Sequence, residues 1–159
     1  HRGADLILIT EPVPERRAIV EANLCSHVFD PAQADAIREH VRTHADHGPE
    51  FVFEAAGMPD SFQMAFDLAR PGGRVAIFGI YPAGTHPIDF TNARRKELEV
   101  IFVRRSLPAN YPVAIQLVAS GGINLNPLMT HLFPLDKIAQ AFDLVARKRD
   151  GVMKATLAI

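Results

Sequence analysis

The sequence lacks the cysteines, the long apolar runs and the net charge that several classes of protein require. Its 159 residues include a single cysteine, Cys25, which excludes an internal disulfide and a multi-cysteine zinc site. No apolar run approaches the ~20 residues of a membrane-spanning helix, and residues 1–20 lack the basic start and apolar core of a signal peptide. The net charge is −1, which offers no field for nucleic acid or an anionic membrane as partner. We therefore expect a globular protein of the reducing cytoplasm.

What is present alternates between strand-like and helix-like segments. Short apolar runs predict strands, and apolar residues at a spacing near 3.6 predict helices. The expected strands are 6–10, 26–29, 51–53, 74–78, 99–103 and 152–159, and the expected helices are about 14–22, 31–44, 59–70, 111–119 and 135–149. Asp30 is the expected N-cap of the second helix, and residues 82–98 are expected to form a long loop. Strands that alternate with helices indicate an α/β fold with a mainly parallel, doubly wound sheet.

Residues 51–81 are the clearest unit in this pattern. Within them the apolar residues Phe62, Ala65, Phe66 and Ala69 are spaced i, i+3, i+4 and i+7, which predicts one buried stripe on a helix. Strand, helix and strand within about thirty residues predict a right-handed βαβ unit with parallel strands.

Small residues follow both strands of this unit. The first is followed by Ala55, Ala56 and Gly57, and the second by Gly79, Ile80 and Tyr81. Ligands bind at the carboxyl ends of the strands in open α/β sheets, and small residues there let a ligand approach the backbone. The same residues could instead serve only to make tight turns, and the pattern alone does not separate the two interpretations.

Glu11 stands at the end of the expected strand 6–10. In a dinucleotide-binding sheet an acidic side chain at such a position accepts hydrogen bonds from the adenosine ribose and repels a 2′-phosphate, which favours NAD over NADP. The planar guanidinium of Arg16 could lie against the adenine. Solvated charges around a helix start are the alternative interpretation, and Arg16 and Arg17 could also accept a 2′-phosphate.

The sequence lacks the glycine-rich phosphate loop G-x-G-x-x-G. Gly72-Gly73 and Gly121-Gly122 do not replace this loop, because neither pair opens a helix after a strand. His40 and His44 share a helical face close to His47, as metal ligands can, although a polar outer face is the simpler interpretation. No serine, histidine or cysteine belongs to a complete catalytic constellation. The residues therefore assign neither a catalytic group nor a metal ligand.

The stretch EAAGMPDSFQMAFDLARPGGRVAIFGIY closely resembles the coenzyme domain of medium-chain dehydrogenases/reductases, the zinc-type alcohol dehydrogenase superfamily. Three later stretches agree in order and spacing: KELEVIFVRRS, YPVAIQLVASGGINLNPLMTHLFPLDKIAQAF and DGVMKATLAI. Together they are most similar to the sorbitol and threonine dehydrogenase-like branch. The resemblance implies an NAD-binding Rossmann-type domain, with NADP less expected. The coenzyme-binding residues it implies are Glu11, Arg16, Ala55, Ala56, Gly57, Gly79, Ile80, Tyr81, Phe102 and Arg104.

The resemblance also implies what this chain lacks. In the family, the zinc ligands lie in an N-terminal catalytic domain, and the first strand with its glycine-rich turn precedes Glu11. We therefore expect a partial coenzyme domain over residues 1–151, inactive alone, and a strand at 152–159 that returns toward the catalytic domain. The parent would be a zinc-dependent, homo-oligomeric dehydrogenase of a small secondary alcohol or polyol. The alternatives are a non-catalytic nucleotide-binding or interaction module and a zinc-free quinone oxidoreductase of the same superfamily.

Overall fold

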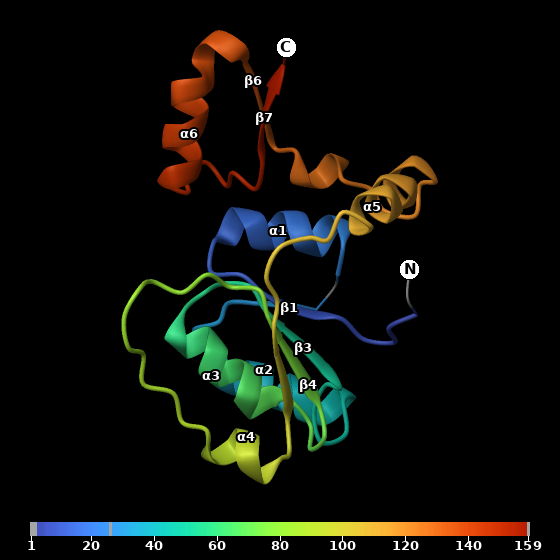
Figure 1. Ribbon diagram of the computed structural model, residues 1–159, viewed down its shortest axis with the longest axis vertical. Coiled ribbons are helices and arrows are strands. Elements are labelled where there is room, and N and C mark those ends of the chain that lie inside the picture. Colours follow the sequence, from blue (N-terminus) through green and yellow to red (C-terminus); the bar gives the residue numbers. More distant parts are fainter. Residues whose placement is uncertain (1–2, 26, 159) are drawn as a thin grey trace. The chain divides into compact units, whose positions relative to one another are not determined.

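The computed structural model describes residues 3–25 and 27–158 (Figure 1), and their contacts divide the chain into two compact units. One unit comprises the described parts of 1–33 and 107–159, and the other comprises 34–106. The strands are β1 (Leu8–Thr10), β2 (His27–Phe29), β3 (Phe51–Glu54), β4 (Arg74–Ile77), β5 (Glu99–Phe102), β6 (His131–Pro134) and β7 (Ala155–Ala158). The α-helices are α1 (Pro14–Asn23), α2 (Ala34–His44), α3 (Pro59–Leu68), α4 (Thr91–Arg95), α5 (Asn110–Ala119) and α6 (Ile138–Ala146). Two short 3-10 helices are η1 (Asn126–Leu128) and η2 (Leu135–Lys137).

Every strand pair in the described residues is parallel. In the unit 34–106 the order is β3-β4-β5, with Val52 beside Val75 and Val75 beside Val100. In the other unit β1 pairs with β2, and β6 pairs with β7. Because helices separate these strands along the chain, the predicted parallel α/β fold is confirmed. None of the described helices is both long and apolar enough to cross a lipid bilayer.

Helix α3 supplies the core of the unit 34–106. Its predicted stripe is buried as expected, and Phe66 and Ala69 have no exposed surface. The stripe packs with Val75 and Ile77 of β4 and with Ala93 of α4. At the end of α3, Lys96 Nζ donates hydrogen bonds to the carbonyl oxygens of residues 66, 67 and 69 over 3.2, 2.7 and 2.8 Å. These bonds satisfy carbonyls that the end of a helix leaves without partners, and burial lowers the pKa of the Lys96 ammonium.

The second helix begins later than predicted, and Asp30 is not its N-cap. Asp30 Oδ1 accepts the Ala32 N–H at 2.9 Å, and the Asp30 carbonyl accepts the Gln33 N–H, also at 2.9 Å. Such local bonds make a turn, so the helix starts only at Ala34.

Two further expectations are wrong. The expected loop 82–98 contains the short helix α4, which buries Ala93. Residues 131–134, where no strand was expected, form β6, which pairs with β7 beside α6 (Figure 1). The last strand covers only Ala155–Ala158 of the predicted 152–159, and Ile159 lies outside the described residues.

Candidate functional site

The carboxyl ends of β3 and β4 meet at two glycines. A Cβ atom on Gly57, whose φ is +70°, would stand 2.6 Å from the carbonyl oxygen of Ile80. A Cβ on Gly79 would collide with the backbone nitrogen of Gly57 and come 2.5 Å from its Cα. Only glycine permits this approach, so the structure brings two of the predicted segments, 55–57 and 79–81, into direct contact.

Glu54 is buried between these segments, with 3% of its surface exposed. Its Oε1 accepts the N–H groups of Ala56 and Gly57, each at 2.9 Å, and the hydroxyl of Ser61 at 2.6 Å. Its Oε2 is also buried, faces Gly79, and has no hydrogen-bond partner among the described residues. Glu54 was not among the site residues predicted from the sequence. The available signal was its place on the same face of β3 as the half-buried Val52, two residues before it.

Tyr81 adds a second buried polar group beside Glu54. Its hydroxyl makes no hydrogen bond that meets normal geometry within the described part of the chain. Burial of that hydroxyl raises the pKa of Tyr81 well above its ordinary value, and the neighbouring Glu54 carboxylate raises it further. The phenol therefore stays protonated throughout the physiological pH range.

The raised pKa of Tyr81 gives a prediction for alkaline pH. Above pH ~10 the unfolded chain loses the phenolic proton while the folded chain keeps it, so the free energy of unfolding falls by at most about 1.4 kcal/mol per pH unit. We expect Tyr81→Phe to remove this part of the slope in urea denaturation at pH 9 and pH 11. At neutral pH the variant should be as stable as the wild type, because no hydrogen bond is lost.

The sequence has only two tyrosines, and the other supplies the control. Tyr111 is 60% exposed, so Tyr111→Phe should leave the alkaline slope of the wild type in place. Equal slopes in the wild type and in Tyr81→Phe would contradict the raised pKa.

The remaining predicted residues of this unit are exposed or lie at the ends of its strands. Ala55 and Ala56 are exposed, and Ile80 has 94% of its surface exposed. The Phe62 ring on α3 contacts both the Tyr81 ring, with centroids 5.6 Å apart, and the Phe102 ring at 6.3 Å. Arg104 is exposed and lies two residues beyond the end of β5. The unit therefore offers an apolar, accessible surface at the ends of three parallel strands.

Glu11 belongs to the other unit and lies directly after β1, as expected. Its N–H donates to the Phe29 carbonyl over 3.0 Å, and its Oε1 accepts the Val13 N–H at 2.9 Å. Arg17 Nη1 donates to the Glu11 carbonyl over 2.7 Å and pairs with Asp30 at 3.0 Å. Arg17 therefore holds the turn after β1, and its charge is already matched by Asp30.

Arg16 is half-buried and differs from Arg17. Its Nε is buried and has no hydrogen-bond partner among the described residues. A buried donor without a partner is unfavourable unless another group accepts from it. The guanidinium of Arg16 is thus less fully hydrogen-bonded than that of Arg17 among the described residues.

The histidine pair of α2 does not belong to this site. The rings of His40 and His44 stack with centroids 4.1 Å apart, and His44 Nδ1 lies 2.9 Å from the His40 carbonyl oxygen. Within the described ranges, no group of three or more His, Cys, Asp or Glu side chains is arranged to hold a metal ion.

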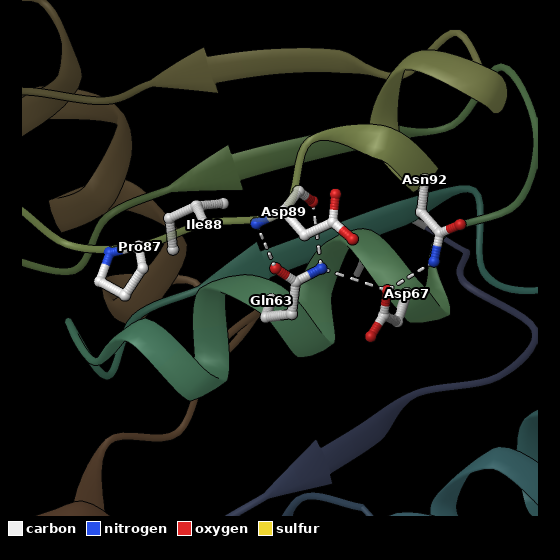
Figure 2. A pocket seen from close by; sticks show the side chains of 6 residues that line it. All are labelled: Gln63, Asp67, Pro87, Ile88, Asp89 and Asn92. Carbon is white, nitrogen blue, oxygen red and sulfur yellow. Dashed lines mark hydrogen bonds between the residues drawn. The ribbon is translucent and has the colours of Figure 1, made fainter.

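A groove of about 620 Å³ lies along α3 (Figure 2). Gln63 spans it: Gln63 Oε1 accepts the Asp89 N–H at 2.9 Å, and Gln63 Nε2 points toward Asp67. Asn92 also donates to Asp67, over 3.0 Å. These bonds fasten residues 87–92 to α3, so we interpret the groove as structural.

Parallel strands with accessible carboxyl ends define the chain as a Rossmann-type α/β domain. The chain belongs to the zinc-binding dehydrogenase family, whose model matches residues 1–120.

The similar proteins are dehydrogenases. L-threonine 3-dehydrogenase of Pyrococcus abyssi is 30% identical over 152 residues, which are 94% of this chain and 43% of that protein. Sorbitol dehydrogenase of Bacillus subtilis is 25% identical over 96% of this chain and 43% of its own length. The solved structure of alcohol dehydrogenase TADH from Thermus sp. ATN1 has a TM-score of 0.84 and 26% identity, and the match covers 98% of this chain and 44% of that one. The chain thus spans less than half the length of these relatives.

Solved structures with the same fold contain either coenzyme. An alcohol dehydrogenase of E. coli CFT073 that is 20% identical was solved with NADH, with a TM-score of 0.84 and coverage of 98% of this chain and 45% of that one. A zinc-binding dehydrogenase of Sinorhizobium meliloti 1021 that is 24% identical was solved with NADP, also with a TM-score of 0.84, over 99% of this chain and 46% of that one. At these identities the likeness concerns the fold.

Proposed function

We propose that this chain forms the coenzyme-binding part of a zinc-type, NAD(H)-dependent dehydrogenase of a small secondary alcohol or polyol. The observation that carries the proposal is the contact of Gly57 with Gly79–Ile80 at the strand ends, which leaves backbone and small side chains for a flat ring to rest against. The coenzyme supplies the hydride chemistry when bound, and the protein binds and orients it. The zinc ion of such a dehydrogenase would act as a Lewis acid on the substrate oxygen. Its ligands would be residues of the whole protein other than those described.

The residues around β1 support NAD rather than NADP. A carboxylate at Glu11 accepts hydrogen bonds from ribose hydroxyls and repels a 2′-phosphate. Arg17, which could have favoured NADP, is engaged by Asp30 and by the Glu11 carbonyl. Arg16 remains the residue that we propose beside the adenosine, because its planar guanidinium can lie against the adenine ring.

We expect Glu11→Ala to weaken NADH binding by roughly tenfold to a hundredfold, because hydrogen bonds to a charged acceptor contribute about 1.5–3 kcal/mol. The measurement is calorimetric titration of the purified chain with NADH and, in parallel, with NADPH. NADPH binding should weaken less or improve, since the repelling charge is gone.

Glu21→Ala is the matched control, because it removes the same charge from an exposed position on α1. It should leave NADH binding unchanged. If Glu11→Ala leaves both affinities as they are in the wild type, Glu11 has no role in coenzyme binding. We further expect the 159-residue chain to turn over no alcohol, and alcohol-dependent NADH production at a rate typical of such dehydrogenases would contradict this.

We also propose a homo-oligomer in the cytoplasm. In the unit 34–106, both β3 and β5 are edge strands among the described residues, and Phe102 on β5 is 72% exposed. An exposed apolar edge favours pairing with a second chain. The single free cysteine is compatible with a reducing compartment.

A further inference from the structure

Glu54 is the one buried charged side chain among the residues that the structure describes. Burial of a carboxylate is expensive unless donors surround it, so a position of this kind needs a physical reason. The proposed function assigns it none, because its oxygens are covered by protein and cannot reach a ligand directly.

The donors around Glu54 come from three separate elements. Its carboxylate accepts hydrogen bonds from the N–H groups of Ala56 and Gly57, in the turn after β3. It also accepts one from the hydroxyl of Ser61, in the first turn of α3. Its backbone carbonyl receives the N–H groups of Phe78 and Gly79 over 2.7 and 3.1 Å, where β4 ends. The carboxylate of Glu54 therefore holds the β3–α3 turn, and its backbone carbonyl binds the end of β4.

The carboxylate also occupies the position that an anion would take at the start of α3. The first N–H groups of a helix and the turn before it attract negative charge, and here Glu54 already accepts from that turn. A coenzyme phosphate would meet satisfied donors and a like charge at this place. The turn is therefore suited to a neutral or cationic group, and it presents exposed Ala55 and Ala56.

We propose that Glu54 is a positioning residue for the coenzyme: its carboxylate holds segment 55–57 in place against segment 79–81, and the two segments form the wall against which the nicotinamide ring rests. This inference rests on the proposed function of the chain. Tyr81 belongs to the second segment, and the contact of its ring with Phe62 joins that segment to the core.

The test compares Glu54→Ala with Glu54→Gln in the purified chain. Glutamine keeps an oxygen that can accept from Ala56, Gly57 and Ser61, whereas alanine removes the acceptor. In Glu54→Ala we expect amide hydrogen exchange at residues 56–57, whose N–H groups lose their carboxylate acceptor, to accelerate at least about tenfold. We expect its NADH dissociation constant to rise about tenfold in calorimetry. Glu54→Gln should restore both quantities to within about threefold of the wild type.

Val75→Ala is the control for a purely structural effect, because Val75 is fully buried in the same unit and away from the turn. It should lower the free energy of unfolding without raising the NADH dissociation constant. If Glu54→Ala does not fold, Glu54→Asp, which withdraws the carboxylate by one methylene, takes its place.

Three results would overturn the proposal. In Glu54→Ala these are unchanged exchange at residues 56–57 or an NADH affinity no lower than that of Val75→Ala. In Glu54→Gln it is failure to restore the values of the wild type. A folded wild-type chain that binds neither coenzyme would overturn the proposed function, and with it the coenzyme part of this inference. Hydrogen exchange, which needs no coenzyme, would still decide whether the Glu54 carboxylate holds the turn after β3.

Discussion

Replacing Gly57 by alanine is expected to lower the free energy of unfolding by about 2–4 kcal/mol and to abolish NADH binding. Two costs add at this position. The backbone φ of +70° is unfavourable for any residue with a Cβ, by roughly 1 kcal/mol. The new methyl group would also stand 2.6 Å from the Ile80 carbonyl oxygen, and overpacking of this kind costs about 1–3 kcal/mol.

Gly72→Ala separates the two costs. Gly72 has nearly the same backbone angle, φ +67°, but a Cβ there would meet nothing within 4 Å. We expect this variant to lose only the backbone term and to bind NADH as the wild type does. Urea denaturation followed by circular dichroism, with calorimetry for NADH, measures both quantities. Equal losses of stability in the two variants would show that the close approach of Gly57 to Ile80 contributes nothing.

The parts of the fold that the sequence predicted are those fixed by local periodicity. The stripe of α3 spans two turns, and the apolar run of β4 is bounded by glycines, so each could be recognised within its own segment. Helix α4 has only five residues and buries Ala93 alone, which leaves no period to detect. Strand β6 contains His131 and Pro134 and is stabilised by pairing with β7, more than twenty residues later. Such pairing is not encoded in the segment itself.

The site shows the same limit. Small residues after two parallel strands predicted correctly that segments 55–57 and 79–81 would lie at one edge of the sheet. The burial of Glu54 was not predicted, because it requires Gly79 to approach the turn after β3 from a different strand. An acidic residue at a strand end is usually solvated, so composition argues against burial. The engagement of Arg17 by Asp30 likewise depends on where β2 ends.

The core and the proposed coenzyme wall meet at Phe62, which is 5% exposed. Its ring contacts Phe66 at 4.8 Å in addition to Tyr81 and Phe102. Truncation of a buried phenylalanine costs about 3–5 kcal/mol, so we expect Phe62→Ala to lower the free energy of unfolding by this amount. Because the Tyr81 and Phe102 rings lose their common support, NADH affinity should fall as well, beyond what lost stability explains.

Phe66→Ala is the matched comparison, because Phe66 is fully buried on the same helix and its other aromatic contact is Phe90, at 5.7 Å. It should lose a similar amount of stability and keep the NADH affinity of the folded chain. The milder substitutions Phe62→Leu and Phe66→Leu repeat the comparison with a smaller loss of stability, so that folded protein is available for calorimetry at 25 °C. A larger loss of NADH affinity for Phe62 variants locates the effect at Tyr81 and Phe102. Equal losses would mean that the wall depends on the core as a whole, and that the Phe62 ring has no separate role in supporting it.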